Sequence, residues 1–285
     1  MVALITPFTN DNEIDYDALT KIVRRLMKEG TNGFIVCGTT AETPTLKEKE
    51  RYAVLAHVLQ VVQGDAEVWF GCGRNCTSDT IRLIHKAEKY PIDGVLCVAP
   101  YYNRPSQQGL YEHYKAIAKA VKLPIMLYNV PSRCGVDITY ETIRRLVHEQ
   151  GNIVGLKQAS KDLETVIRMK KEYPDFQIFS GEDAYFDEGL DAGMDGLISV
   201  MGHFNMPLIQ AFLNDGRKNN LLKKRLYHEA GLTFCDASPA PVKYILSRRG
   251  ECENRLRLPM CRVSREKEIL LGGYFDKIQE EDNLY

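Results

Sequence analysis

Short apolar runs rich in β-branched residues recur along the chain, with starts roughly 20 to 34 residues apart. Eight can be read from the sequence, at residues 2–6, 34–38, 68–73, 94–99, 124–130, 153–159, 176–182 and 196–200. The runs are continuously apolar rather than alternating, which is typical of strands buried on both faces of a parallel sheet. We therefore predict eight buried parallel strands.

The segments between these runs have a helical period. In residues 16–28, Leu19, Ile22, Val23 and Leu26 fall on one stripe, and residues 47–62, 77–89, 139–148 and 162–171 follow the same pattern. The spacing fits a βα unit, and eight such units in under 200 residues predict an α/β protein with a (β/α)8 TIM barrel. A doubly wound open sheet is the alternative, but no GxGxxG sequence follows the first run.

The pattern changes after residue 200. Residues 207–213 and 221–234 have helical periodicity, and no further strand-like run follows. We therefore expect a catalytic barrel over residues 1–215 and a C-terminal helical extension over residues 216–285.

Composition narrows the functional classes. Thirty-seven Lys and Arg residues against 38 Asp and Glu residues give a net charge of -1, which argues against a sequence-independent nucleic-acid binder and against a polybasic membrane anchor. No stretch approaches the length of an apolar membrane helix. The eight cysteines form no CxxC pair, and Cys37 and Cys97 lie inside apolar runs, which favours buried free thiols in a reducing compartment. We expect a cytoplasmic protein without a nucleic-acid or membrane partner.

Lys157 is the sharpest chemical signal in the sequence. In a (β/α)8 barrel, chemistry belongs at the C-terminal ends of the strands, and Lys157 lies near the end of the otherwise apolar sixth run. It is either a structural lysine paired with a carboxylate or a Schiff-base lysine. Burial disfavours the ammonium form, so that the free amine could attack a ketone.

Other polar residues collect at neighbouring strand ends. Tyr128 is either a core aromatic residue or a general acid/base beside Lys157. Thr39 and Thr40 directly follow the second strand, as turn-forming hydroxyls or as ligands of a carboxylate. Arg133 follows a Pro-Ser turn, as a solvated side chain or as a bidentate clamp for a substrate carboxylate.

The sequence offers no metal or nucleotide site. None of the six histidines pairs at HxH or HxxxH spacing, and there is no P-loop, GxSxG elbow or dinucleotide fingerprint. We expect neither a metal nor an organic cofactor.

Several segments, in order from Val2 to about Pro259, resemble the dihydrodipicolinate synthase family, which shares a superfamily with N-acetylneuraminate lyase. They are GTTAETPTL at 38–46, PYYNRPSQQGLYEHY at 100–114, LYNVPSRCGVDI at 127–138, GLKQAS at 155–160, GLISV at 196–200, APVKY at 240–244 and LRLPM at 256–260. The resemblance implies a barrel with a C-terminal helical extension.

The resemblance also implies a role for each residue. Lys157 forms an imine with pyruvate, and Tyr128, Thr39 and Tyr102 relay protons, with Tyr102 reaching in from a neighbouring subunit. Substrate-binding roles fall to Thr40 and Ile198 at the pyruvate site, Arg133 at the aldehyde carboxylate, and Gly181 at the end of the seventh strand.

The implied reaction condenses pyruvate with L-aspartate 4-semialdehyde to 4-hydroxy-tetrahydrodipicolinate, on the diaminopimelate route to lysine. The alternative is a class I pyruvate aldolase that cleaves a sugar acid, N-acetylneuraminate or a 2-keto-3-deoxy acid, although such relatives commonly lack the arginine at position 133. A catalytically silent homologue is a third reading, against which the intact Lys157, Tyr128, Thr39 and Tyr102 argue. A cross-subunit Tyr102 requires a homodimer at least, and relatives are often homotetramers built as dimers of dimers.

A possible lysine effector site is implied at Asn75, Asp79 and Tyr101. Glu48 and Arg51 stand where histidines or other residues occur in lysine-sensitive relatives, so the expectation, open to a lysine titration, is weak or absent inhibition. Three further departures from the family pattern are Ala41 in place of glycine, Cys134 in place of threonine and Gln158 in place of glutamate.

Overall fold

Eight strands form one sheet, and they follow one another in chain order in the computed structural model, which describes residues 1–214 and 216–282. They are β1 (Val2–Ala3), β2 (Gly33–Val36), β3 (Glu67–Gly71), β4 (Gly94–Val98), β5 (Ile125–Asn129), β6 (Ile153–Gln158), β7 (Gln177–Ser180) and β8 (Gly196–Leu197). Each of the eight apolar runs thus overlaps one strand, and β2 and β3 begin one residue before their runs. Most strands end before their run does, because burial continues past the last pair of the ladder.

The chain divides into two compact units. The first contains Met1, residues 33–38 and residues 67–199, and the second contains residues 2–32, 39–66 and 200–285. The expected division at residue 215 stays a prediction.

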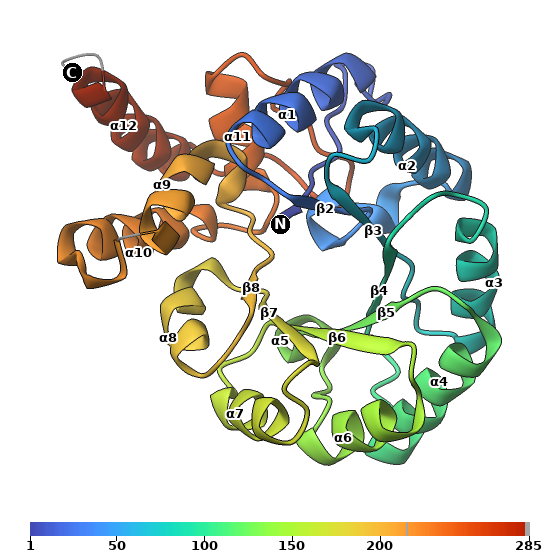
Figure 1. The fold of residues 1–285 in the computed structure, drawn as a ribbon. Helices are drawn as coiled ribbons and strands as arrows, with labels where there is room; N and C mark the ends of the chain where they lie inside the picture. Colours follow the sequence, from blue (N-terminus) through green and yellow to red (C-terminus); the bar gives the residue numbers. More distant parts are fainter. Residues whose placement is uncertain (215, 283–285) are drawn as a thin grey trace. The chain divides into compact units, whose positions relative to one another are not determined.

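The first unit holds strands β2 to β8, all paired in parallel. Its helices are α3 (Thr77–Ala87), α4 (Gln107–Ala120), α5 (Pro131–Cys134), α6 (Tyr140–Glu149), α7 (Leu163–Glu172) and α8 (Phe186–Asp191), with the short 3₁₀ helix η3 (Asp183–Tyr185) before α8. Figure 1 shows α3, α4, α6 and α7 around the outside of these strands. Met1 also lies beside β8, where its nitrogen donates to the Leu197 carbonyl and its own carbonyl accepts from the Ser199 amide, both at 2.9 Å.

The second unit is mainly helical apart from β1. It contains α1 (Tyr16–Lys28), α2 (Glu48–Val62), α9 (Gly202–Asn214), α10 (Asn220–Thr233), α11 (Ala240–Arg248) and α12 (Arg265–Asp282). Three 3₁₀ helices, η1 (Thr39–Ala41), η2 (Thr43–Thr45) and η4 (Gly216–Lys218), complete it. The stripe predicted on residues 16–28 is confirmed, because Leu19, Ile22, Val23 and Leu26 of α1 are all buried.

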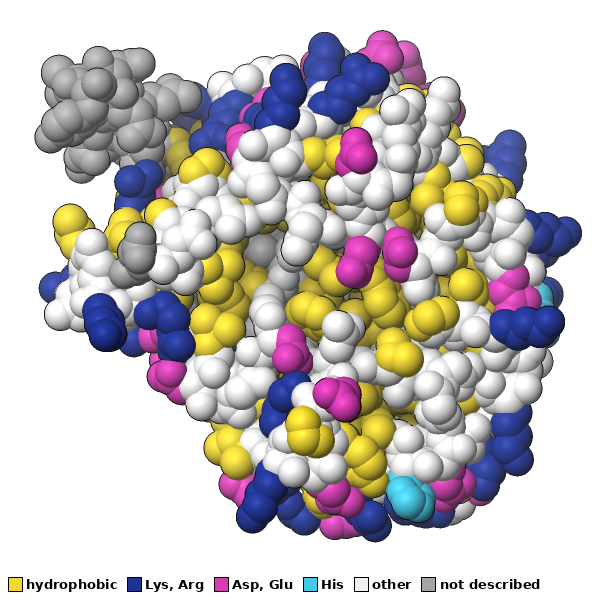
Figure 2. Space-filling model, viewed as in Figure 1, with side chains coloured by type: hydrophobic (Ala, Val, Ile, Leu, Met, Phe, Trp, Pro, Cys, Tyr) yellow, Lys and Arg dark blue, Asp and Glu magenta, His cyan; other side chains and the backbone are white. Residues whose placement is uncertain are grey.

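The two signs of charge are interspersed on the face that Figure 2 shows. On the face in Figure 2, Lys and Arg side chains alternate with Asp and Glu side chains around the edge, with apolar surface between them. Among the described residues, no helix is long and apolar enough to span a membrane.

Candidate active site

Lys157 and Tyr128 face each other across two neighbouring strands. Tyr128 of β5 is the register partner of Lys157 of β6, so the parallel ladder places their side chains side by side. The Lys157 Nζ atom lies 4.6 Å from the centroid of the Tyr128 ring. Both residues are buried, at 5% and 6% exposure. The expected juxtaposition of the two residues at the strand ends is present in the structure.

Burial makes the Lys157 amine easier to deprotonate. Loss of hydration disfavours the ammonium form and is the main reason why the pKa of Lys157 falls to about 8. The carboxylates of Glu182 and Asp183 oppose this shift, and the Arg133 guanidinium adds to it. A lysine with this pKa presents a substantial fraction of free amine near neutral pH, as a nucleophilic amine must.

The two carboxylates after β7 have different surroundings. Asp183 is buried and accepts a short hydrogen bond from the Ser199 hydroxyl, which follows β8. Glu182 is less enclosed, and burial together with the charge of Asp183 raises its pKa. Asp183 begins η3, and neither carboxylate is among the residues that the sequence predicts to act on Lys157. The acidic pair directly after a strand end was the available signal.

Gly181 gives the Lys157 side chain its space. A methyl group at position 181 would lie 2.9 Å from the Lys157 Cε atom and 2.9 Å from the Ala159 Cβ atom. Real Cβ atoms do not approach other atoms this closely, so a larger residue would force Lys157, Ala159 or both to shift. The geometry therefore shows a direct reason for glycine beside the lysine.

The other residues expected near the lysine occupy the same strand ends. Arg133 lies in α5, directly after β5, and its side chain is exposed. Ile198 follows β8, is fully buried and donates its amide to the Ser180 carbonyl at 2.9 Å. Arg133 is thus available to an incoming anion, whereas Ile198 contributes a buried apolar side chain.

The segments that follow β3 and β4 carry the aromatic and effector candidates, of which Asp79 lies in the first turn of α3. Tyr102 is 90% exposed and has a left-handed backbone, with φ of 73°. Asn103 ties the two loops together, because its Nδ2 atom donates to the Asn75 carbonyl at 2.8 Å. Asn75 and Asp79 are exposed and Tyr101 is partly so, and the Asp79 carboxylate lies 3.5 Å from Arg82. Their effector role stays a prediction.

Thr39 and Thr40 belong to the second unit, where they form the 3₁₀ turn η1 directly after residue 38. Thr40 is buried and Thr39 is partly exposed. The residue with left-handed backbone in this turn is Glu42, with φ of 56°, and not Ala41. Alanine at position 41 therefore meets no backbone penalty.

Comparison with known proteins decides the family. A model of the dihydrodipicolinate synthetase family matches residues 1–272. The chain belongs to this family.

Relatives match over nearly their whole length. The chain is 37% identical to a 4-hydroxy-tetrahydrodipicolinate synthase of Bacillus subtilis over 97% of each chain. It superposes on a dihydrodipicolinate synthase from Aquifex aeolicus with a TM-score of 0.92 and 35% identity, covering 98% and 97% of the two chains. It superposes on a dihydrodipicolinate synthase from Acinetobacter baumannii complexed with pyruvate with a TM-score of 0.90 and 34% identity, covering 95% of each chain. The predicted (β/α)8 barrel with C-terminal helices is confirmed.

Two departures from the family pattern are accommodated by hydrogen bonds. Cys134 is buried, and its thiol donates to the Ala99 carbonyl at 3.2 Å. Gln158, next to the lysine, is buried, and its Oε1 atom accepts from the side-chain Nδ2 atom of Asn129 at 2.9 Å. Neither departure removes a group from the Lys157–Tyr128 pair.

Proposed function

We propose that this protein condenses pyruvate with L-aspartate 4-semialdehyde to give 4-hydroxy-tetrahydrodipicolinate, on the diaminopimelate route to lysine. The observation that carries the proposal is the buried Lys157 amine, with its lowered pKa, beside the Tyr128 ring. Membership of the dihydrodipicolinate synthetase family supports the choice of substrates.

The Lys157 amine begins the reaction. It adds to the pyruvate ketone, and loss of water gives an imine in which the nitrogen acts as the electron sink. Loss of a methyl proton then gives an enamine, which attacks the aldehyde carbon and forms the new carbon–carbon bond. The amine of the second substrate finally displaces the Lys157 nitrogen and closes the ring. Lys157 itself supplies the carbanion chemistry, so these steps call on no metal or organic cofactor.

The remaining residues bind substrates and move protons in this proposal. Tyr128 transfers protons at the imine, with Thr39 and Tyr102 as the relay that the family motifs imply. Thr40 binds the pyruvate carboxylate, and Arg133 binds the carboxylate of the aldehyde substrate, which suits a guanidinium. Ile198 and Gly181 shape the pyruvate site; the space beside Lys157 that Gly181 leaves open supports that role.

We also propose that the working form is a homodimer or a homotetramer. The support is Tyr102, whose side chain is 90% exposed and whose backbone is left-handed. A cytoplasmic location is part of the same proposal.

Borohydride trapping tests the central step. Borohydride reduces an imine to a stable amine, so pyruvate and borohydride should add one reduced pyruvate unit to Lys157, detectable by mass spectrometry of the peptides. Lys157→Ala should abolish the adduct. Tyr128→Phe should still form it, while turnover falls about 10²- to 10⁴-fold through loss of the proton-transferring group. An adduct that survives in Lys157→Ala would contradict the proposed nucleophile.

Choice of aldehyde separates the two enzyme readings. Pyruvate consumption should be seen with aspartate semialdehyde and not with N-acetylmannosamine or glyceraldehyde. Turnover with only a sugar aldehyde would keep the roles of Lys157 and Tyr128 and assign the protein to the sugar-acid aldolases instead.

A further inference from the structure

Glu42 links the turn that carries Thr39 and Thr40 to the turn that follows it. Its amide donates to the Thr39 carbonyl at 3.1 Å, which closes the turn. Its own carbonyl accepts from the Thr45 amide at 2.9 Å and from the Thr45 hydroxyl at 3.0 Å. Its backbone is left-handed, which residues with a side chain seldom adopt unless the surroundings hold it there.

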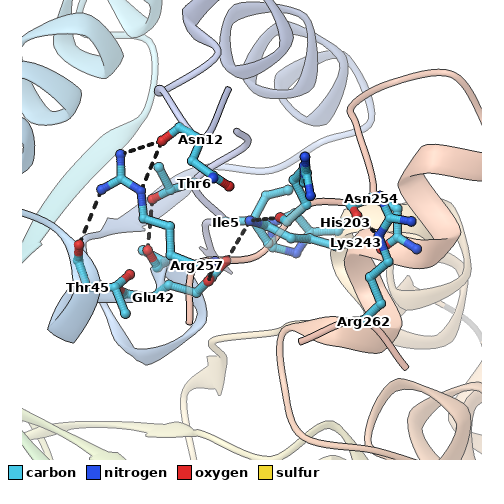
Figure 3. A network of polar contacts seen from close by, with 12 residues as sticks. Ile5, Thr6, Asn12, Glu42, Thr45, His203, Lys243, Asn254, Arg257 and Arg262 are labelled. Carbon is cyan, nitrogen blue, oxygen red and sulfur yellow. Dashed lines mark hydrogen bonds and ion pairs between the residues drawn. The ribbon is translucent and has the colours of Figure 1, made fainter. Parts of the chain in front are cut away.

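The Glu42 carboxylate is held by the C-terminal part of the chain. Lys243 of α11 donates from Nζ to Oε1 at 2.5 Å, and the side chains of both residues are fully buried. The amide of Arg257 donates to the other oxygen, Oε2, at 3.0 Å. Figure 3 shows these groups converging on Glu42.

Lys243 is itself fixed in place on several sides. Its Nζ atom also donates to the Arg255 carbonyl at 2.8 Å and lies 4.1 Å from the centroid of the Phe8 ring. Arg257, whose amide binds Glu42, is anchored by a bidentate ion pair to Glu50. Every donor to the carboxylate is thus immobilised.

A fully buried ion pair is a poor device for stability alone, because the cost of removing two charges from water offsets most of their attraction. What such a pair does well is fix one geometry, since its short, charge-assisted hydrogen bonds tolerate little displacement. Here the fixed group is two residues from Thr40 in the chain. The Thr6 hydroxyl, which donates to the Ala41 carbonyl at 2.9 Å, constrains the same turn independently.

We propose that Glu42 and Lys243 form a positioning pair, through which α11 sets the Thr39–Thr40 hydroxyls for the pyruvate carboxylate and for proton transfer. This proposal rests on the proposed function, because it needs the two threonines to act on substrate. It also gives the C-terminal helices a catalytic purpose.

The test uses Lys243→Met and Glu42→Gln in the full chain, at a temperature well below each variant's Tm. In both, we expect kcat with pyruvate and aspartate semialdehyde to fall about 10- to 100-fold and KM for pyruvate to rise, as for small displacements of catalytic groups. The borohydride adduct at saturating pyruvate should persist, because Lys157 is unaltered. If Lys243→Met fails to fold, Glu42→Gln alone carries the test, since the glutamine oxygen can still accept from Lys243, and loss of the Glu42 charge lets the buried lysine release its proton.

The double variant and a matched control separate positioning from stability. Combining Glu42→Gln with Lys243→Met removes both charges, so Tm should recover relative to Lys243→Met while kcat stays low. Glu229→Gln is the control, because Glu229 is an equally buried carboxylate held by Asn205, Arg225 and Tyr274. It should lower Tm and leave kcat and KM unchanged.

Two results would overturn the proposal in distinguishable ways. Unchanged kcat and KM in Lys243→Met and Glu42→Gln, or a kcat that recovers with Tm in the double variant, would show that the pair is only structural. Failure of the unsubstituted protein to form the adduct would instead refute the proposed function, on which the pair's role depends.

Discussion

Lys157 owes its chemistry to where the chain buries it. The strand that carries it, β6, is paired on both sides by β5 and β7, so its amine has little access to water. The nearby charges act in opposite directions, since Glu182 and Asp183 favour the ammonium form and Arg133 disfavours it. Burial outweighs the carboxylates, so the net effect is a lowered pKa.

This balance predicts how adduct formation depends on pH. Only the free amine attacks the ketone, and the pKa of Lys157 is about 8. The initial rate of borohydride-trapped adduct formation should therefore rise about tenfold for each pH unit below that pKa and level off above it. Rates measured in a series of buffers of constant ionic strength check this expectation.

Two variants move the profile in opposite directions. Glu182→Gln removes a charge that raises the pKa of Lys157, so the rise should shift to lower pH. Arg133→Gln removes a charge that lowers this pKa, so the rise should shift to higher pH. Shifts in the same direction, or a flat profile in the unsubstituted protein, would be inconsistent with the electrostatic account.

At the scale of elements, β6 supplies the long side chain of Lys157, and the end of β7 is followed by Gly181, which has no side chain. Gly181→Ala places a methyl group 2.9 Å from the Lys157 Cε atom. We expect the rate of adduct formation to fall by about tenfold or more, because relief of this close contact moves the Lys157 side chain. The trapped-adduct assay measures this rate directly.

Gly151→Ala is the matched control for that substitution. A methyl group there would meet no atom within 4 Å, and Gly151 lies between α6 and β6, well before the reactive end of the strand. Its adduct rate should equal that of the unsubstituted protein. Equal rates in Gly181→Ala would instead mean that Lys157 has room that the geometry does not show.

Local sequence patterns are enough to predict most helices and strands and the strand ends that carry the reactive residues. The helix expected at residues 16–28 has the bounds of α1, because its stripe is uniformly apolar. Helix α4 was not among the expected helices, since its buried face mixes Tyr111, His113 and Tyr114 with leucine and isoleucine. The strand predicted at residues 2–6 is longer than β1, because Leu4 and Ile5 are buried although they lie outside the strand.

Contacts between distant positions lay beyond any local pattern. Glu42 and Lys243 are 201 residues apart, and they lie in two separate motifs of the family resemblance, neither of which indicates that the two residues meet. The family resemblance supplied Thr39 and Thr40 but not the residues that hold their turn. Only the three-dimensional arrangement shows that the C-terminal helices reach this turn.

At the scale of the whole molecule, Tyr102 determines whether one chain suffices. A tyrosine that is 90% exposed on a left-handed backbone makes few contacts within its own chain. If it completes the proton relay of a neighbouring subunit, activity depends on assembly. Light scattering coupled to gel filtration should then show a dimer or tetramer at assay concentrations, and dilution below the assembly range should reduce the specific activity.

Mixed subunits provide the sharper test of this dependence. Lys157→Ala lacks the nucleophile and Tyr102→Phe lacks the relay hydroxyl, so each protein alone should be nearly inactive. After unfolding and refolding together, a mixed dimer contains one site with both an intact Lys157 and a partner's intact Tyr102. Activity should therefore return to about a quarter of the unsubstituted level, because half of the dimers are mixed under random pairing and each has one complete site. Lys157→Ala mixed with Tyr128→Phe is the matched control, because Lys157 and Tyr128 act in one chain, so that no site of a mixed dimer contains both. That mixture should stay inactive, and recovery there, or none with Tyr102→Phe, would contradict a cross-subunit tyrosine.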